Sequence, residues 1–236
     1  MSDKIIAMIP ARIGSTRLKF KNLALVNKKP LIYYSINASI ESNIFDKIII
    51  NSDDNVFKKI ANRYKVGFYN RPKKLGGNNI KSDDVVYDFL KSYKCDVLVW
   101  VNPIAPLQDP KDINKIVKDF LKSNSNSLYT VVDRKVHALY QNKILNFKKD
   151  IKFQQTQSLK PITEMVYTLM MWKRKEFIKN YSKFGNAFLK GKIKYYKVDT
   201  LNSFIVKNAN DLFIVDTIIK SLNSKNKVKY DRILKK

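Results

Sequence analysis

Short apolar runs alternate with segments whose apolar residues recur at helical spacing along the first half of the chain. The runs are brief and rich in β-branched residues, which predicts strands at Ile5–Ile9, Lys47–Asn51, Val66–Tyr69, Asp96–Val101 and Ser127–Val132. The segments between them carry one apolar face and open with Pro, Asp or Ser, which predicts helices at 30–40, 53–64, 82–91 and 109–121. Strict alternation of strand and helix is typical of a doubly wound, mostly parallel sheet, so we expect a three-layer α/β/α fold.

The pattern loosens after the fifth predicted strand. Residues 134–161 form short mixed pieces, within which Ala138–Phe147 has the alternation of a small antiparallel excursion. We interpret 134–161 as an insertion or dimerisation arm inside a single domain that covers residues 1–236. Beyond it, Met165–Trp172 and Lys194–Val198 are predicted to complete the sheet, and Asp211–Leu222 to close the fold as a helix.

The net charge of the chain bears on the kind of partner that it binds. A formal net charge of +26 invites a nucleic-acid partner, because clustered Lys and Arg bind phosphate through counterion release. The lysines are instead spread along the whole chain, and no helix-turn-helix, arginine-rich arm or aromatic RNA-binding motif accompanies them. We therefore expect no nucleic-acid partner, and a positive field that attracts an anionic small molecule.

The apolar runs also bear on membranes and compartment. None approaches the roughly 20 uninterrupted apolar residues of a membrane helix, so no membrane partner is expected. Ile5–Ile9 is too short for a signal peptide and lacks a small-residue cleavage site, which predicts a cytoplasmic protein. Cys95 is the single cysteine, which excludes an internal disulfide and a cysteine-rich zinc site. Its place before an apolar run favours a small buried hydrophobe over a nucleophile.

The loop after the first predicted strand concentrates cations and small polar residues. Arg12, Arg17 and Lys21 can neutralise phosphate charge, and Ser15 offers a hydroxyl donor. Gly14 would let the backbone approach a phosphate closely. We interpret this loop as a triphosphate cradle, against the alternative of a solvated basic loop. It has neither the Gly-x-x-x-x-Gly-Lys-[Ser/Thr] pattern nor the Gly-x-Gly-x-x-Gly pattern.

The same loop resembles a known family. Pro10-Ala-Arg-Ile-Gly-Ser, followed six residues later by Lys21-Asn, is similar to the signature of the acylneuraminate cytidylyltransferases, the CMP-sialic acid synthetases. Further matches follow in order at Pro30-Leu-Ile, Asn51-Ser-Asp-Asp, Arg71-Pro, Ser82-Asp-Asp-Val and Asn102-Pro-Ile-Ala-Pro-Leu. The loop sequence Ser15-Thr-Arg-Leu also resembles the Ser-Ser-Arg-Leu of the CMP-Kdo synthetases. Both sister families couple CTP to an acidic keto-sugar.

The resemblance implies a reaction and a set of site residues. The anomeric hydroxyl of an acidic sugar would attack the α-phosphate of CTP and release pyrophosphate, with Mg²⁺ clamping the phosphate oxygens. The family habit also implies a homodimer and a fold like that of the nucleotide-diphospho-sugar transferases. Arg12 and Lys21 are the expected catalytic residues. The expected nucleotide-binding residues are Ala11, Arg12, Gly14, Ser15, Arg17, Lys21, Asn22, Arg71 and Ser82.

Two departures from the family affect the acceptor. Where the family has the segment Gln-Pro-Thr-Ser-Pro-Leu-Arg, this chain has Asn102 at the position of the glutamine and Gln108 at the position of the arginine. We expect both residues to meet the acceptor sugar, and the loss of an arginine removes a bidentate carboxylate clamp. Met170–Trp172 lies in an apolar strand, where core packing is favoured over an acceptor pocket. The acceptor is left open among sialic, legionaminic, pseudaminic and Kdo-like acids.

The largest departure is at the metal site. The family has an Asp-Ile-Asp-x-x-x-Asp pattern, whereas this chain has Ile205 and Lys207 at the first two aspartates and keeps Asp211 as one candidate ligand. Three explanations compete: Lys207 replaces the charge of the cation, Mg²⁺ arrives with CTP and is held by fewer protein groups, or the chain has lost activity.

Two other functions stay open. One is a nucleotidyltransferase for another anionic acceptor, such as a phosphonate or a sugar phosphate, or for another nucleotide. The other is a non-catalytic sugar-nucleotide-binding module. Among weaker candidates, we interpret His137 as incidental, and the pair Asp53-Asp54 either as an N-cap or as a ligand of metal or ribose.

Overall fold

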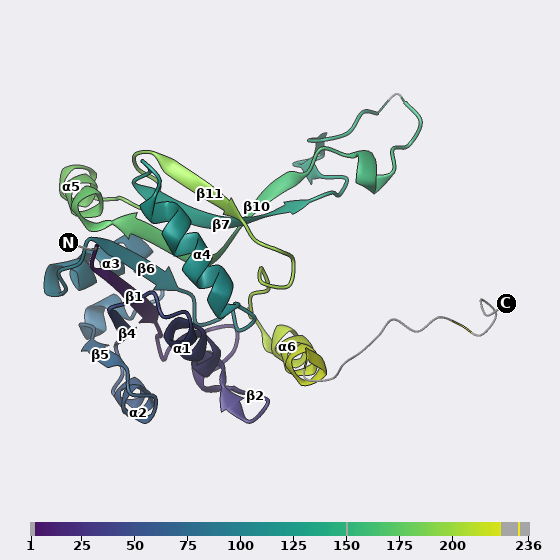
Figure 1. The fold of residues 1–236 in the computed structure, drawn as a ribbon. Coiled ribbons are helices and arrows are strands. Elements are labelled where there is room, and N and C mark those ends of the chain that lie inside the picture. The colour runs from purple at the N-terminus through teal and green to yellow at the C-terminus, as the bar shows by residue number, and fades with distance from the viewer. Residues whose placement is uncertain (1–2, 150, 223–230, 232–236) are drawn as a thin grey trace.

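A seven-stranded sheet forms the centre of the molecule, with strand order β11-β7-β10-β6-β1-β4-β5 (Figure 1). The computed structural model describes residues 3–149, 151–222 and 231. The seven strands are β1 (Ile5–Pro10), β4 (Lys47–Ser52), β5 (Gly67–Asn70), β6 (Val97–Val101), β7 (Ser127–Arg134), β10 (Ile162–Lys173) and β11 (Ile193–Lys197). Every strand predicted from the sequence is therefore present in this sheet.

The sheet is mostly parallel, as predicted. β1 pairs in parallel with β4 and β6, β4 with β5, and β7 with β11. β10 is the exception, because it runs antiparallel between β6 and β7. β7 and β10 are joined by the 134–161 segment without a crossover helix, so the chain returns in the opposite direction. The β10–β7 register shifts between Met165 and Met170, and Tyr167 in this bulge has a φ of 53°.

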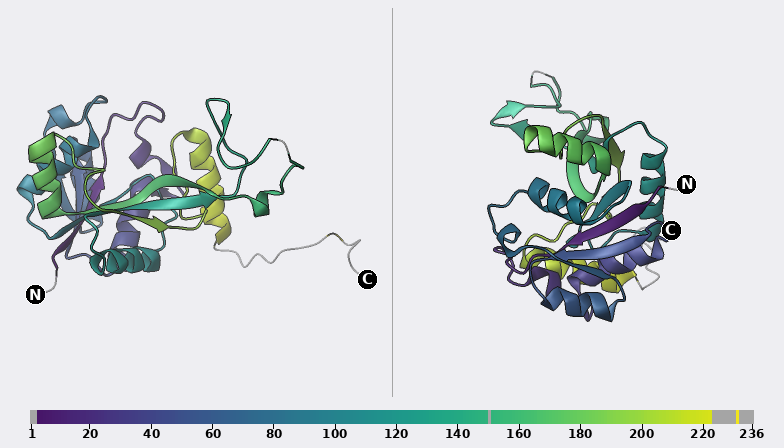
Figure 2. Two further views of the ribbon diagram at one scale, coloured as in Figure 1. Left: turned by 90° about the horizontal axis from the view of Figure 1, so that it is seen from above. Right: turned by 90° about the vertical axis from the view of Figure 1, so that its left-hand side faces the viewer.

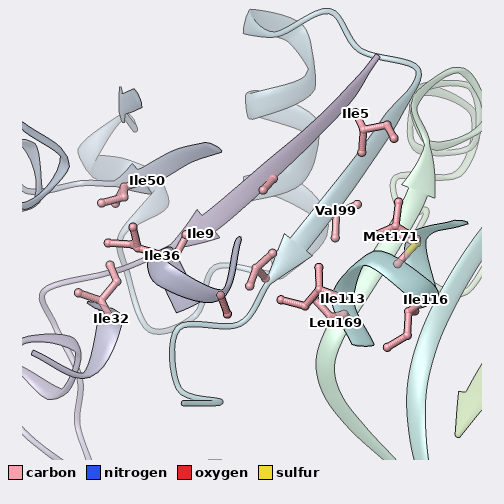
Figure 3. Close-up of a cluster of buried hydrophobic side chains, with 14 of the residues drawn as sticks. Ile5, Ile9, Ile32, Ile36, Ile50, Val99, Ile113, Ile116, Leu169 and Met171 are labelled. Carbon is pink, nitrogen blue, oxygen red and sulfur yellow. The ribbon is translucent and has the colours of Figure 1, made fainter. Parts of the chain in front are cut away.

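Side chains alternate between the two faces of the sheet, and helices cover both. Ile5 and Ile9 of β1 belong to one buried cluster with Ile32, Ile36 and Ile113 (Figure 3), whereas Ile6 and Met8 belong to a second cluster with Phe89 and Phe177. Helices lie on both sides of the sheet (Figure 2). This arrangement gives three layers and confirms the predicted α/β/α fold. The helices are α1 (Leu31–Glu41), α2 (Val56–Arg63), α3 (Ser82–Ser92), α4 (Pro110–Leu121), α5 (Arg174–Phe184) and α6 (Ala209–Leu222).

Helix α5 is missing from the sequence prediction. Phe177, Ile178 and Tyr181 recur at helical spacing and pack into one hydrophobic cluster, so the apolar periodicity was present in the sequence and was overlooked. A second signal is Gly185, which follows the helix with a φ of 69° and ends it in the left-handed conformation.

Residues 135–149 and 151–161 extend beyond the sheet from the ends of β7 and β10 (Figure 1). They contain a short antiparallel hairpin, β8 (Leu139–Tyr140) with β9 (Lys143–Ile144), which confirms the predicted excursion. The 3₁₀ turn Thr156–Ser158 follows it. A second hairpin, β2 (Leu25–Val26) with β3 (Lys29–Pro30), lies against α6 and was not predicted.

Two further predictions concern single features. Cys95 is buried, and burial raises the pKa of its thiol to about 12, in agreement with its interpretation as a small hydrophobe. Over the described residues, no helix combines the length and apolar character that a bilayer span requires.

Candidate active site

A cavity of about 320 Å³ opens at the carboxyl ends of β1 and β6. This is the edge at which doubly wound sheets bind their ligands. The cavity is lined by three groups of residues from separate parts of the chain. They are 10, 12, 15–17, 21 and 22 from the loop after β1; 71, 75, 77, 78, 80, 82 and 85 from the loop after β5 and the start of α3; and 100 and 102–104 from the end of β6.

The structure brings most of the predicted residues together at this cavity. Arg12, Ser15, Arg17, Lys21, Asn22, Arg71, Ser82 and Asn102 all line it. Ala11 and Gly14 do not. Ala11 is fully buried and its N–H donates to the Asn51 carbonyl at 2.9 Å, so it ties the loop to β4. No heavy atom lies within 4 Å of the Cβ position of Gly14, so nothing in the protein itself requires glycine there.

Lys21 is the most constrained cation of the site. It opens the 3₁₀ turn Lys21–Leu23 and its side chain is only 8% exposed. Within the described part of the chain, no hydrogen bond or ion pair holds its ammonium group. Burial, with the neighbouring Arg17 and Arg12, lowers the pKa of Lys21 from 10.5 to about 8, and Asp211 partly offsets the shift. A buried ammonium without a partner is prepared to meet an anion.

Two contacts fix the ends of the phosphate loop. The Asn22 side-chain amide donates to the Arg12 carbonyl at 3.5 Å, which joins the end of the loop to its beginning. The Arg12 guanidinium donates to Asn78 Oδ1 at 2.8 Å, which links the loop to the segment before α3. Asn22 Oδ1 is buried without a partner, so it is an acceptor still to be satisfied at the cavity wall.

Arg71 is held in the wall by an acidic partner. Its guanidinium lies 3.1 Å from Asp53 Oδ1, and both side chains are largely buried. Burial lowers the pKa of Arg71, while the Asp53 hydrogen bond and charge oppose this. Neither acid is the N-cap of α2, because Asn55 occupies that position; Asp54 precedes it, and its Oδ1 accepts the Val56 N–H at 2.8 Å. Asp53 instead positions Arg71. A Cβ at Gly76 would lie 2.2 Å from Asp53 Oδ2, so glycine makes room for this carboxylate.

Ser82 is the first residue of α3, and the helix points its N-terminal end towards the cavity. The sequence predicts a side-chain cap here, which is wrong, because Lys81 occupies the cap position and no side chain bonds to the first turn. Both acids of that turn face α5 and the loop after it: Asp83 accepts the Ala187 and Phe188 N–H groups, and Asp84 accepts the Tyr181 hydroxyl at 2.6 Å. Their charges offset part of the helix dipole, but neither carboxylate accepts an N–H group of the first turn of α3.

The two predicted acceptor-binding residues lie in different places. Asn102 lines the cavity, and its amide donates to the Tyr167 carbonyl at 3.1 Å in the bulge of β10. Gln108 lies outside the cavity lining. Its amide donates to the Ala105 carbonyl at 3.1 Å, which closes the turn before α4. Met170 and Trp172 are buried in the core, as favoured from the sequence.

Asp211, the one candidate metal ligand kept from the family pattern, is engaged by the backbone at the start of α6. Asp211 Oδ2 accepts the N–H groups of Lys207 and Asn208 at 2.7 and 3.0 Å, so this carboxylate caps α6. Ile205 is half-buried and Lys207 is exposed. Across residues 3–149, 151–222 and 231, no group of three or more His, Cys, Asp or Glu side chains could hold a metal ion. These residues do not fit a protein-held Mg²⁺.

Several cavity residues escaped the sequence analysis. Thr16, Asn78 and Trp100 line the cavity, and the buried Trp100 Nε1 has no hydrogen-bond partner. The signal for Asn78 was the run Gly76-Gly-Asn-Asn between a strand and a helix, a composition common in ligand-binding loops. Trp100 lies inside an apolar run and carried no such signal.

Comparison with known proteins agrees with this geometry. Residues 6–198 match the family described as Cytidylyltransferase. The chain belongs to this family. This cytidylyltransferase is 28% identical over 235 residues to post-translational flagellin modification protein B of Campylobacter coli, covering 94% of the chain and 97% of the relative. It is 34% identical over 119 residues to an N-acylneuraminate cytidylyltransferase of Escherichia coli, of which the match spans only 28%.

A third relative, a pseudaminic acid cytidylyltransferase of Campylobacter jejuni, is 30% identical over 137 residues, which are 55% of this chain and 59% of the relative. Among solved structures, a CMP:2-keto-3-deoxy-manno-octonic acid synthetase complexed with CTP superimposes with a TM-score of 0.71 at 14% identity, over 93% of this chain and 99% of that one. This likeness confirms the fold of the cytidylyltransferase over nearly its whole length.

Proposed function

We propose that this cytidylyltransferase is a cytoplasmic enzyme that transfers CMP from CTP to an acidic keto-sugar and releases pyrophosphate. The observation that carries the proposal is the cavity at the end of β1, where Arg12, Arg17 and the buried Lys21 converge. Family membership supports cytidylyl transfer, and the names of the relatives from Escherichia coli and Campylobacter jejuni support an acidic sugar as acceptor.

The order of strands suggests how the substrates lie. Arg71 follows β5 on one side of the phosphate loop, and Asn102 follows β6 on the other side. We place the nucleoside towards Arg71 and Ser82, the triphosphate over the loop after β1, and the acceptor towards Asn102. An in-line displacement requires the acceptor oxygen to approach the α-phosphorus opposite the leaving pyrophosphate, so in this arrangement the pyrophosphate would point away from Asn102.

In the proposed reaction, a hydroxyl oxygen of the sugar bonds to the α-phosphorus of CTP, and the bond from that phosphorus to the α,β-bridging oxygen breaks. The electron pair of that bond leaves with pyrophosphate, and the hydroxyl proton passes to solvent. Arg12, Arg17 and Lys21 neutralise the charge that grows on the leaving group. Because its pKa is about 8, Lys21 is largely protonated at neutral pH, and a neighbouring phosphate raises this pKa further.

The proposal is tested by measuring acceptor-dependent pyrophosphate release with ATP, CTP, GTP and UTP. The acceptors are N-acetylneuraminic acid, pseudaminic acid and 2-keto-3-deoxy-manno-octonic acid. Release of pyrophosphate with CTP and at least one acceptor supports the proposal. Release with a different nucleotide and not with CTP would show that the enzyme uses that nucleotide instead. CTP binding without turnover on any acceptor would favour the non-catalytic alternative.

The chain also carries features of a dimerisation arm. Residues 135–161 present exposed apolar side chains, namely Val136, Leu139, Tyr140, Leu145, Ile151 and Phe153, the last 83% exposed. Apolar surface of this extent on a projecting segment is typical of a protein interface. We propose that two copies pair through this arm. Sedimentation velocity should give a dimer for the natural chain and a monomer for Leu139→Asp with Phe153→Asp, and a natural chain that stays monomeric contradicts the pairing.

A further inference from the structure

The charged residues that line the cavity are all cationic. Among its lining residues, Arg12, Arg17, Lys21 and Arg71 are cationic, and none is Asp, Glu, His or Cys. Arg71 is already paired with Asp53. Arg12 bonds to the neutral amide oxygen of Asn78, and no carboxylate neutralises Arg17 or Lys21 through an ion pair in the described residues. The wall thus presents three uncompensated positive charges to a ligand.

Asp211 gives little support to a metal ion. Among the described residues, it is the carboxylate whose charge raises the pKa of Lys21. Its Oδ2 accepts two backbone N–H groups at the start of α6, and a metal ion at this oxygen would compete with that cap. The adjacent Lys207 and the buried Lys21 would also repel a divalent cation. Mg²⁺ needs carboxylate or carbonyl oxygens in near-octahedral geometry, which a single committed carboxylate does not supply.

We infer that the protein's own cations, and not a metal ion held by protein carboxylates, neutralise the triphosphate, so that this site binds the nucleotide in its metal-free form. Arginine forks bind phosphate oxygens in pairs, and the Lys21 ammonium adds a compact point charge. Mg²⁺ on the nucleotide would occupy the same oxygens and compete with these side chains. The inference rests on the proposed function, since it takes a nucleoside triphosphate as the ligand.

The test measures CTP affinity by calorimetry with full-length protein, in EDTA and in millimolar MgCl₂. Affinity in EDTA should equal or exceed that in MgCl₂. A dissociation constant that rises about tenfold or more, or 1.4 kcal/mol, when EDTA replaces Mg²⁺ would overturn the inference. If CTP binds only in the presence of Mg²⁺, the inference is wrong and the proposed function still stands. If CTP binds in neither condition, the inference and the proposed function are both wrong.

Three variants separate the sources of charge. Lys21→Gln should weaken CTP binding by roughly 10- to 100-fold in EDTA and in Mg²⁺ alike, the cost of one charge-assisted contact. Lys19→Gln removes an equal charge from the same loop, at an exposed side chain that does not line the cavity, and should change binding less than threefold. Asp211→Asn should leave the ratio of the EDTA and Mg²⁺ constants unchanged. If Asp211→Asn abolishes a Mg²⁺-dependent gain in affinity, Asp211 is a metal ligand and the inference fails.

Discussion

Lys21 makes the folded protein less stable than a neutral residue would, and the size of this effect follows from its pKa. The pKa falls from 10.5 to about 8 in the folded state. At 1.36 kcal/mol per unit, the charged form costs about 3 kcal/mol of folding free energy. Lys21 lines an open cavity, so solvent screens part of this cost. Lys21→Met keeps the length of the side chain and removes the charge, so we expect it to stabilise the nucleotide-free protein by about 2–3 kcal/mol at pH 7.

The pH dependence distinguishes this cause from better packing. Below pH 8 the lysine is protonated in both the folded and the unfolded states, so the whole penalty is present. Between pH 8 and 10.5 the unfolded state holds more protons, so stability of the natural chain rises with pH. Above 10.5 both forms are neutral and the penalty disappears. The advantage of Lys21→Met should therefore be complete at pH 7 and shrink towards pH 10.

The assay is denaturant unfolding of both proteins at several pH values from 7 to 10, with Lys19→Met as the exposed control. Lys19→Met should change stability by less than about 0.5 kcal/mol at every pH. In the same preparations, Lys21→Met should lose CTP affinity by at least tenfold. A Lys21→Met protein that is less stable than the natural chain at pH 7 would show that the buried ammonium does not destabilise the fold. A stability difference that does not change with pH would show the same.

Three more predictions follow from other contacts of the site. Asp53→Ala should destabilise the protein by about 3 kcal/mol and raise the KM for CTP, because it leaves the buried Arg71 unpaired. As a control, Glu164→Ala breaks the exposed pair with Arg134 and should cost less than about 1 kcal/mol. Equal losses of unfolding free energy in urea would contradict the greater importance of the buried pair. Asn102→Ala should raise the KM for the acceptor more than that for CTP, and equal increases in both KM values would contradict a place for Asn102 at the acceptor. Gln108→Ala should have a smaller effect on the KM for the acceptor than Asn102→Ala, because Gln108 lies outside the cavity and reaches it only through a bond to the Asn102 carbonyl at 3.4 Å. Cys95, with its pKa raised to about 12, should resist iodoacetamide at pH 8 until urea unfolds the chain, and mass spectrometry that finds rapid alkylation of the folded protein would show that the thiol is accessible.

Most strands of the sheet could be predicted because the residues of each strand favour the structure that the strand adopts. Val97–Val101 is apolar on both faces and is a central strand, and Asp109 caps α4 by accepting the Lys111 N–H at 2.7 Å. The antiparallel direction of β10 had no local signal, because strand direction depends on the connection and not on the strand's own residues. Helix α5 was missed although Phe177, Ile178 and Tyr181 form an apolar stripe, because many lysines and polar residues lie between them.

In the candidate site, too, contiguous motifs could be predicted from the sequence, whereas contacts between distant residues could not. The loop after β1 was predictable because its motif is contiguous and its residues reach the ligand edge together. The role of Asp53 was not, since its partner Arg71 lies 18 positions away and the pair forms only when β4 and β5 lie side by side. Gln108 was placed at the acceptor by position in a motif, whereas its amide is used to close a local turn. The outcome for Asp211, a cap of α6, likewise depends on backbone N–H groups that the sequence does not display.

The most direct test of the whole account is ³¹P nuclear magnetic resonance of CTP mixed with the protein and one acidic keto-sugar at a time. The account predicts that the signals of CTP are replaced by those of pyrophosphate and of a single CMP phosphodiester in equal amounts, and that Lys19→Gln but not Lys21→Gln retains the rate. Intact CTP in the presence of every acceptor, or pyrophosphate formed without a CMP-linked sugar, would contradict cytidylyl transfer at this site.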